Sequence, residues 1–213
     1  MATIKELTVY QALIEISRIN DMIDKQKRRE VNYYVSAAPE NSQKISGFNR
    51  SEAEDILKSV YDSMNHLILN LASYKGAVAL SNATTKVKIN GKEYTVAEAI
   101  QKKANFDTEM SFYNDIRNNI TSVKNYIEKE NRKIENGLES YLEKVKTENT
   151  TPEEIEKLTD KYYLDRKLVM VDPYKLATTI DKKIEDLTKF MNEVDNALTY
   201  SNCVTTIAVE LED

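Results

Sequence analysis

Residues 85–96 read Thr-Lys-Val-Lys-Ile-Asn-Gly-Lys-Glu-Tyr-Thr-Val and carry the strongest local signal in the chain. Apolar and polar residues alternate on both sides of Asn90-Gly91, a dipeptide that readily adopts the positive φ angles of a type I′ turn. The pattern predicts a β-hairpin. Thr95-Val-Ala-Glu98 then has the spacing of a capping box, in which the Thr and Glu side chains accept from each other's backbone N–H groups. We therefore expect the second strand to continue directly into a helix.

The helix that follows the hairpin is predicted to be very long. From residue 96 to residue 147, apolar residues recur at alternating steps of three and four, as in a coiled coil. At about 1.5 Å per residue, one helix of this length would measure roughly 75 Å. Its apolar stripe needs cover from the other helices, from a second copy of the chain, or from both.

Four further helices are expected where a capping signal precedes an apolar stripe. Their predicted starts and ends are Thr8 to residues 30–33, Ser51 to Leu80, Thr151 onward, and Asp172-Pro173 to Ser201-Asn202. Residues 33–50 hold Pro and Gly without any periodicity and predict a long loop, a feature that is often functional in compact domains. Residues 168–171 are expected to be extended.

A segment in the middle of the chain and a segment near its end share a sequence pattern. Residues 80–89 and 200–209 both read as the end of a helix, then Ser-Asn, then a Thr-rich strand. Because an isolated hairpin is marginally stable, we expect a C-terminal strand at 204–210 to join the hairpin at 85–96 in a three-stranded sheet. The predicted fold is mainly α: a single elongated helical domain over residues 1–213, an antiparallel bundle with coiled-coil character and one small sheet.

Three segments share features with a known family. They are Tyr10-Gln-Ala-Leu-Ile-Glu15, residues 81–100, and the closing Val171-Asp-Pro with Ser201-Asn-Cys-Val-Thr205. These segments resemble the septicolysin-like helical proteins, and residues 81–100 are also similar to a segment of uncharacterised proteins encoded by phages of Gram-positive bacteria. The resemblance implies a phage-encoded helical rod of unassigned function, and it carries over no catalytic residue.

The composition narrows the classes of function. The 213 residues include 30 Lys and Arg, 35 Asp and Glu, one His and one Cys, with a net charge of −5. This balance gives no overall basic field for nucleic acid or anionic lipid, and no stretch is long and apolar enough to span a bilayer. We expect a soluble protein without membrane contact, in a bacterial host cytoplasm or in a virion.

The residues that carry catalysis in most enzymes are scarce. A thiol activated by histidine would need His66 and Cys203 within hydrogen-bond reach, but the predicted helices place them roughly 20 Å apart. One His and one Cys cannot form a zinc site, and acidic residues such as Glu52 fall in first helical turns, where the helix dipole explains them. No phosphate-binding or dinucleotide motif occurs. We expect a non-enzymatic protein with no cofactor or metal.

Two candidate interaction regions remain. One is an oligomer interface on the long helix, in which Asn131 would set the register, in a homo-oligomer that is first of all a dimer; the alternative is a monomer whose helix from Thr151 folds back over that stripe. The other is a basic run followed by tyrosines, which a solvated helix end explains, with a phosphorylated ligand or nucleic acid as the alternative. The residues are Ile120, Ile127, Asn131, Ile134, Leu138 and Tyr141 for the first region and Lys25, Lys27, Arg28, Arg29, Tyr33 and Tyr34 for the second.

These observations favour a structural or protein-interaction role. We expect a phage virion or assembly component that binds itself and another protein. The alternative is a phage-encoded binding protein that sequesters a host defence component or a small ligand, with residues 33–50 as its recognition loop.

Overall fold

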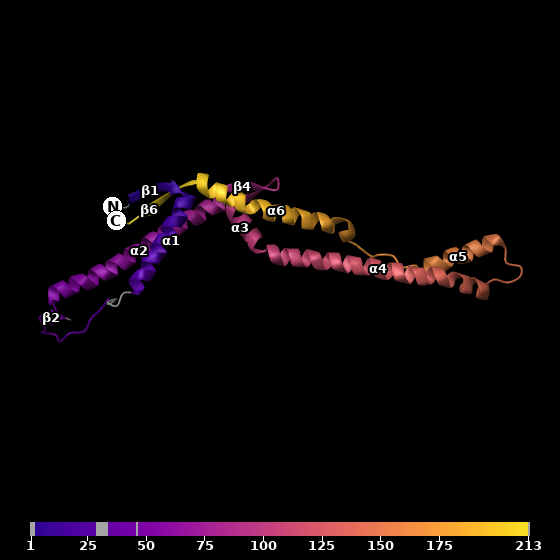
Figure 1. The fold of residues 1–213 in the computed structure, drawn as a ribbon, viewed down its shortest axis with the longest axis horizontal. Coiled ribbons are helices and arrows are strands. Elements are labelled where there is room, and N and C mark those ends of the chain that lie inside the picture. Colours follow the sequence, from indigo (N-terminus) through magenta and orange to yellow (C-terminus); the bar gives the residue numbers. More distant parts are fainter. Residues whose placement is uncertain (1–2, 29–33, 46, 213) are drawn as a thin grey trace. The chain divides into compact units, whose positions relative to one another are not determined.

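The computed structural model describes residues 3–28, 34–45 and 47–212, and its fold is mainly α with small two-stranded antiparallel sheets (Figure 1). The chain divides into two compact units: unit 1 is Met1–Ala104 with Phe190–Asp213, and unit 2 is Asn105–Lys189. In chain order, the elements are β1 (Thr3–Thr8), α1 (Val9–Lys27), β2 (Lys44–Ile45), β3 (Phe48–Asn49), α2 (Arg50–Thr84), β4 (Lys86–Ile89), β5 (Lys92–Thr95), α3 (Val96–Ala104), α4 (Phe106–Val145), α5 (Pro152–Arg166), α6 (Leu176–Val204) and β6 (Thr206–Leu211).

The predicted hairpin is confirmed. Strands β4 and β5 pair antiparallel around Asn90 and Gly91, whose φ angles are 48° and 74° as a type I′ turn requires. The capping box that follows is also present, because the Thr95 N–H donates to Glu98 Oε2 at 2.7 Å and the Glu98 N–H donates to Thr95 Oγ1 at 3.1 Å. Strand β5 therefore leads into α3 without a linker.

The predicted three-stranded sheet is wrong. Strand β6 pairs instead with β1, antiparallel and in register from Thr3 opposite Leu211 to Thr8 opposite Thr206. In β1 only Leu7 is buried, so the N-terminal segment shows none of the apolar alternation that identifies a half-buried strand. The chain ends thus form a two-stranded ribbon of their own.

The apolar face of the hairpin is covered by helix α6. Phe190 and Val194 of α6 are buried against Val87 and Ile89 of β4, and the Tyr94 ring meets the Phe190 ring edge-on with centroids 5.5 Å apart. A hydrogen bond also joins the turn to α6, because the Asn90 N–H donates to Glu193 at 2.6 Å. Helix α6 therefore supplies the apolar cover for the hairpin face, and β6 pairs with β1 instead.

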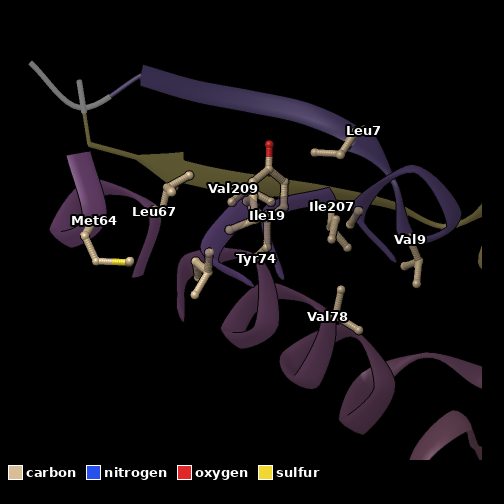
Figure 2. Close-up of a cluster of buried hydrophobic side chains, with 11 residues drawn as sticks. Leu7, Val9, Ile19, Met64, Leu67, Tyr74, Val78, Ile207 and Val209 are labelled. Carbon is tan, nitrogen blue, oxygen red and sulfur yellow. The ribbon is translucent and has the colours of Figure 1, made fainter. Parts of the chain in front are cut away.

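A larger core lies under the β1–β6 ribbon. Side chains of α1 and α2 pack together beneath the strands, and Tyr74 at the centre is almost fully buried (Figure 2). Burial of apolar surface on this scale is the main stabilising term for such a unit. Its buried members are Leu7, Val9, Ala12, Ile19, Ile23, Met64, Leu67, Tyr74, Val78, Ile207 and Val209.

The single long helix predicted for residues 96–147 is also wrong. The helix is interrupted at Asn105, where φ is −89° and ψ is 0°, and it therefore forms two helices, α3 and α4. Asn competes with helical hydrogen bonding through its own side chain and favours helix ends. The apolar stripe continues across Asn105, so the spacing of apolar residues alone could not predict where the helix is interrupted.

Several predicted helix boundaries are corrected. Helix α2 begins at Arg50 without a side-chain cap, so the expected Ser51 capping box is absent. The Arg50 N–H donates to the Gln43 carbonyl and its guanidinium to the Glu40 carbonyl at 2.7 Å, which fixes this start inside the predicted loop. That loop also holds the short β2–β3 hairpin. Helix α1 ends at Lys27, α2 at Thr84 and α6 at Val204, and residues 168–171 form no strand.

Candidate functional site: the groove on helix α4

Helix α4 is the main element of unit 2, and its apolar stripe is incompletely covered. The helix has 40 residues, all described by the structure, and none of them is buried. The stripe residues are instead half-buried along the length of the helix. A helix with a heptad stripe and no buried residue normally has a further partner.

Helix α5 covers the C-terminal part of the stripe. The Tyr162 hydroxyl donates to the Ile134 carbonyl at 2.8 Å, and the rings of Tyr162 and Tyr141 lie with centroids 4.7 Å apart. The pairs Tyr141 with Tyr162 and Asn131 with Leu168 run in opposite chain directions, so α5 lies antiparallel on α4 (Figure 1). The helix from Thr151 does fold back over the stripe, which was the alternative to an oligomer at these residues.

Small and charged residues fix this helix pair. Gly137 leaves room for Tyr162, because a Cβ at Gly137 would lie 2.9 Å from the Tyr162 hydroxyl oxygen. The Arg166 guanidinium lies over the Tyr162 ring at 4.6 Å and over the Tyr141 ring at 5.2 Å. Such cation–π contacts contribute about 0.5–1 kcal/mol at exposed sites. The predicted Thr151 capping box at the start of α5 is confirmed.

The N-terminal part of the stripe is approached by the first half of α6. Lys183 Nζ lies 5.6 Å from the centre of the Tyr113 ring, and Ile180 and Leu187 on the same helix are buried. The Tyr113 hydroxyl donates to Glu109 at 2.7 Å, and this hydrogen bond, with partial burial, raises the pKa of Tyr113 above its ordinary value. Within unit 2, α5 and α6 thus cover opposite ends of α4.

The stripe between Phe112 and Val123 borders an open groove of about 340 Å³, which we call the α4 groove. One wall is α4 and the other is the connection between α5 and α6. Val171 and Tyr174 in that connection are 87% and 81% exposed, and Phe112 is 60% exposed, which is unusual for large apolar side chains. The lining residues are Phe112, Asp115, Ile116, Asn119, Ile120 and Val123 on α4, with Met170, Val171, Asp172, Pro173, Tyr174 and Leu176 opposite.

Asp172 holds the second wall of the groove in place. Its two carboxylate oxygens accept from the N–H groups of Leu176 and Ala177, each at 2.8 Å. These hydrogen bonds, the one from Ala177 foremost, hold the pKa of Asp172 below its ordinary value. Lys175 completes the turn with a φ of 55°, and α6 begins at Leu176 rather than at the predicted Asp172-Pro173.

The predicted interface residues fall into two groups. Ile120 lines the α4 groove, and Ile127 and Leu138 are half-buried on the stripe. Asn131, Ile134 and Tyr141 contact α5 or the segment that follows it. Of the predicted interface residues, Ile120 is therefore the one that lines the α4 groove.

The predicted basic run is only partly described. Lys25 and Lys27 lie in the last turn of α1, and Arg28 caps that helix with its N–H on the Asp24 and Gln26 carbonyls. Arg29 and Tyr33 lie outside the described residues. Tyr34 borders a separate shallow pocket of about 300 Å³, together with Tyr61, Met64, Asn65 and Ile68 of α2.

His66 and Cys203 lie on different helices, α2 and α6. His66 Nε2 is 2.9 Å from Asn70 Nδ2, one turn along α2, and Cys203 is exposed near the end of α6. In the parts of the chain that the structure describes, no three His, Cys, Asp or Glu side chains gather as a metal site. Among the same residues, no helix combines the length and apolar character needed to cross a bilayer.

No protein-family model, curated protein or solved structure matches this chain. The resemblance to septicolysin-like helical proteins therefore stays a prediction. Sequence reasoning singled out Ile120 and expected residues 168–171 to be extended, but the structure forms no strand there, and the groove between the two segments was not predicted. The available signal was the run of four large apolar residues, Leu168-Val-Met-Val171, directly before Asp172-Pro173.

Proposed function

We propose that this chain is a non-enzymatic structural protein that associates with a second copy of itself through the α4 groove. The observation that supports this most is the α4 stripe between Phe112 and Val123, which faces only the irregular segment at 170–175 and the start of α6, with exposed Phe112, Val171 and Tyr174 around it. A second copy would bring an identical heptad stripe to this face. Two such stripes are self-complementary in a two-fold dimer.

A second candidate function is sequestration of a small apolar ligand or of a host peptide. The volume of the α4 groove, about 340 Å³, lies at the lower end of small-ligand sites, and Asp115 and Asn119 would supply polar contacts. The groove is wide open rather than enclosed, which favours a protein surface as the occupant. We therefore rank self-association first.

Light scattering at micromolar concentration tests the proposal. The wild-type chain is expected to give twice the single-chain mass of 24.5 kDa. Ile120→Glu places a charge in the groove and should give the single-chain mass, whereas Asn118→Glu adds the same charge at an exposed position of α4 and should leave the dimer intact. A wild-type mass of 24.5 kDa would overturn self-association. A groove-dependent ligand bound by that monomer would favour sequestration.

A further inference from the structure

Two segments far apart in the chain have matching sequences and matching structures. Residues 5–13 read Lys-Glu-Leu-Thr-Val-Tyr-Gln-Ala-Leu, and residues 92–100 read Lys-Glu-Tyr-Thr-Val-Ala-Glu-Ala-Ile. In each, a strand ends at a Thr that forms a capping box with the residue three positions on, Gln11 or Glu98. Both segments are therefore the same strand-to-helix transition.

The same side chains are buried at both transitions. Val9 and Val96 are each 2% exposed, and Ala12 and Ala99 are each fully buried. Matching capping residues alone would not require equal burial of the residues around them. The equality indicates that each helix start packs into an equivalent environment.

The helix-to-strand transitions also match, as the sequence pattern shared by residues 80–89 and 200–209 suggested. Ser81 and Ser201 are both buried, and their carbonyls accept from the N–H groups of Thr85 and Thr205 at 2.8 and 2.9 Å. After each Thr, the strand buries alternate residues. These are Val87 and Ile89 in β4, and Ile207 and Val209 in β6.

One hydrogen bond joins the two kinds of transition, and it occurs twice. The Val96 N–H donates to the Thr85 carbonyl at 2.9 Å, and the Val9 N–H donates to the Thr205 carbonyl at 2.9 Å. In the first case the strands are connected by the Asn90-Gly91 turn. In the second case the strands are β6 and β1, at opposite ends of the chain.

The registers of the two strand pairs agree as well. Ile89 lies opposite Lys92 next to the turn, and the equivalent residues Val209 and Lys5 lie opposite each other in the β1–β6 ribbon. The ribbon then continues for two more pairs, to Thr3 opposite Leu211. In an antiparallel pair, hydrogen-bonded and non-hydrogen-bonded residue pairs alternate with a period of two. The pair Thr3 and Leu211 is therefore of the same kind as the pair Lys92 and Ile89.

The two cores of unit 1 are built in the same way. One joins α1 and α2 with β6, and the other joins α3 and α6 with β4. In the first core both helices precede β4 in the chain, and the buried strand is the C-terminal β6. In the second core both helices follow β5, and the buried strand is β4, which precedes them. Tyr74 of α2 and Val194 of α6 hold the equivalent central positions.

From these matches we infer that unit 1 is a closed pair of strand–helix–helix–strand repeats that exchange their last strands. The first repeat is β1, α1, α2 and β4, and the second begins at β5 and ends at β6. The β1–β6 ribbon is the unconnected equivalent of the β4–β5 hairpin. The partner that each repeat fits is therefore another copy of the same repeat, and the chain supplies both.

The second repeat is longer than the first. Thr8 and Thr95 are 87 positions apart, but Ser81 and Ser201 are 120 apart, so the second repeat holds 33 more residues. The extra residues fall between α3 and α6 and account for only part of unit 2, Asn105–Lys189.

A circular permutant tests the equivalence of the two strand pairs. Leu211 would be joined to Thr3 through Asn-Gly, and the chain would be opened between Asn90 and Gly91, so that each strand pair takes the connectivity of the other. We expect a cooperative melt within about 10 °C of the native chain. A control with the same join, opened inside the loop between Ala37 and Ala38, shows whether the join itself is tolerated.

Backbone hydrogen exchange gives a second, more specific readout. In the native chain the Val96 amide should exchange more slowly than the Val9 amide, because its strand pair is closed by a turn. The permutant should reverse this order. An unreversed order, or an unfolded permutant beside a folded control, would overturn the inference. Since the permutant keeps unit 2 intact, its mass reports on the proposed function separately.

Discussion

Asn131 and Leu168 form a reciprocal pair of hydrogen bonds across unit 2. Asn131 Nδ2 donates to the Leu168 carbonyl at 2.9 Å, and the Leu168 N–H donates to Asn131 Oδ1 at 2.8 Å. The Asn131 side-chain amide thus satisfies both backbone polar groups of Leu168, which follows the end of α5. It thereby fixes where the second wall of the α4 groove begins.

Replacing Asn131 with Ala should therefore destabilise unit 2. Leaving the partly buried backbone groups of Leu168 unpaired costs about 1–3 kcal/mol. Thermal unfolding followed by circular dichroism measures this cost. Asn125→Ala, at an exposed position of the same helix, is the matched control and should change stability by less than about 0.5 kcal/mol. Equal effects of the two substitutions would show that the reciprocal pair has no special role.

Gly137 and Tyr162 should show coupled effects. Ala is the better helix former by about 1 kcal/mol, yet its Cβ at 137 would lie 2.9 Å from the Tyr162 hydroxyl, which donates to the Ile134 carbonyl. Gly137→Ala should therefore destabilise the wild-type chain and stabilise the Tyr162→Phe variant. Chemical denaturation of the four variants measures the coupling.

Gly76 is the control for this cycle. It lies within α2, where an added Cβ would meet nothing within 4 Å. Gly76→Ala should stabilise the chain by up to about 1 kcal/mol in both Tyr162 backgrounds. A Gly137→Ala effect of the same sign in both backgrounds would disprove the proposed steric conflict.

Asp172 should make stability depend on acidic pH. Its pKa in the folded protein is lowered by the N–H groups of Ala177 and Leu176, so it binds its proton more weakly folded than unfolded. Its contribution is then fully present above the unfolded value near 3.8 and is lost as the pH falls through the lower folded pKa. The stability difference between wild type and Asp172→Asn should be constant above about pH 5 and shrink below pH 4. A difference that stays constant down to pH 2 would contradict this role.

The parts of the fold that the sequence predicted are those specified by neighbouring residues. The hairpin depends on Asn90-Gly91 and its flanking alternation, and the helix starts at Thr8, Thr95 and Thr151 depend on side chains three positions away. Each is decided within a dozen residues. Local signals therefore suffice for them.

The wrong predictions concern features that depend on contacts between residues far apart in the sequence. Strand β1 exists because β6 pairs with it, and the hairpin lacks a third strand because β6 is already paired with β1. The α4 groove depends on how Asn131 and Asp172 fix the two ends of a connection that has no regular structure. None of these pairings leaves a periodic pattern in the sequence.

The most direct test of self-association is an intermolecular distance measured by pulsed electron resonance. The exposed Cys203, the single cysteine of the chain, would be replaced by Ser, and one spin label placed at Asn118→Cys on the exposed side of α4. Helices that pack side by side have axes about 8–10 Å apart. A dimer through the α4 groove should therefore give one distance below about 40 Å, and Ile120→Glu should abolish it. A wild-type sample at micromolar concentration with no intermolecular distance, or with one that persists in Ile120→Glu, would contradict the account.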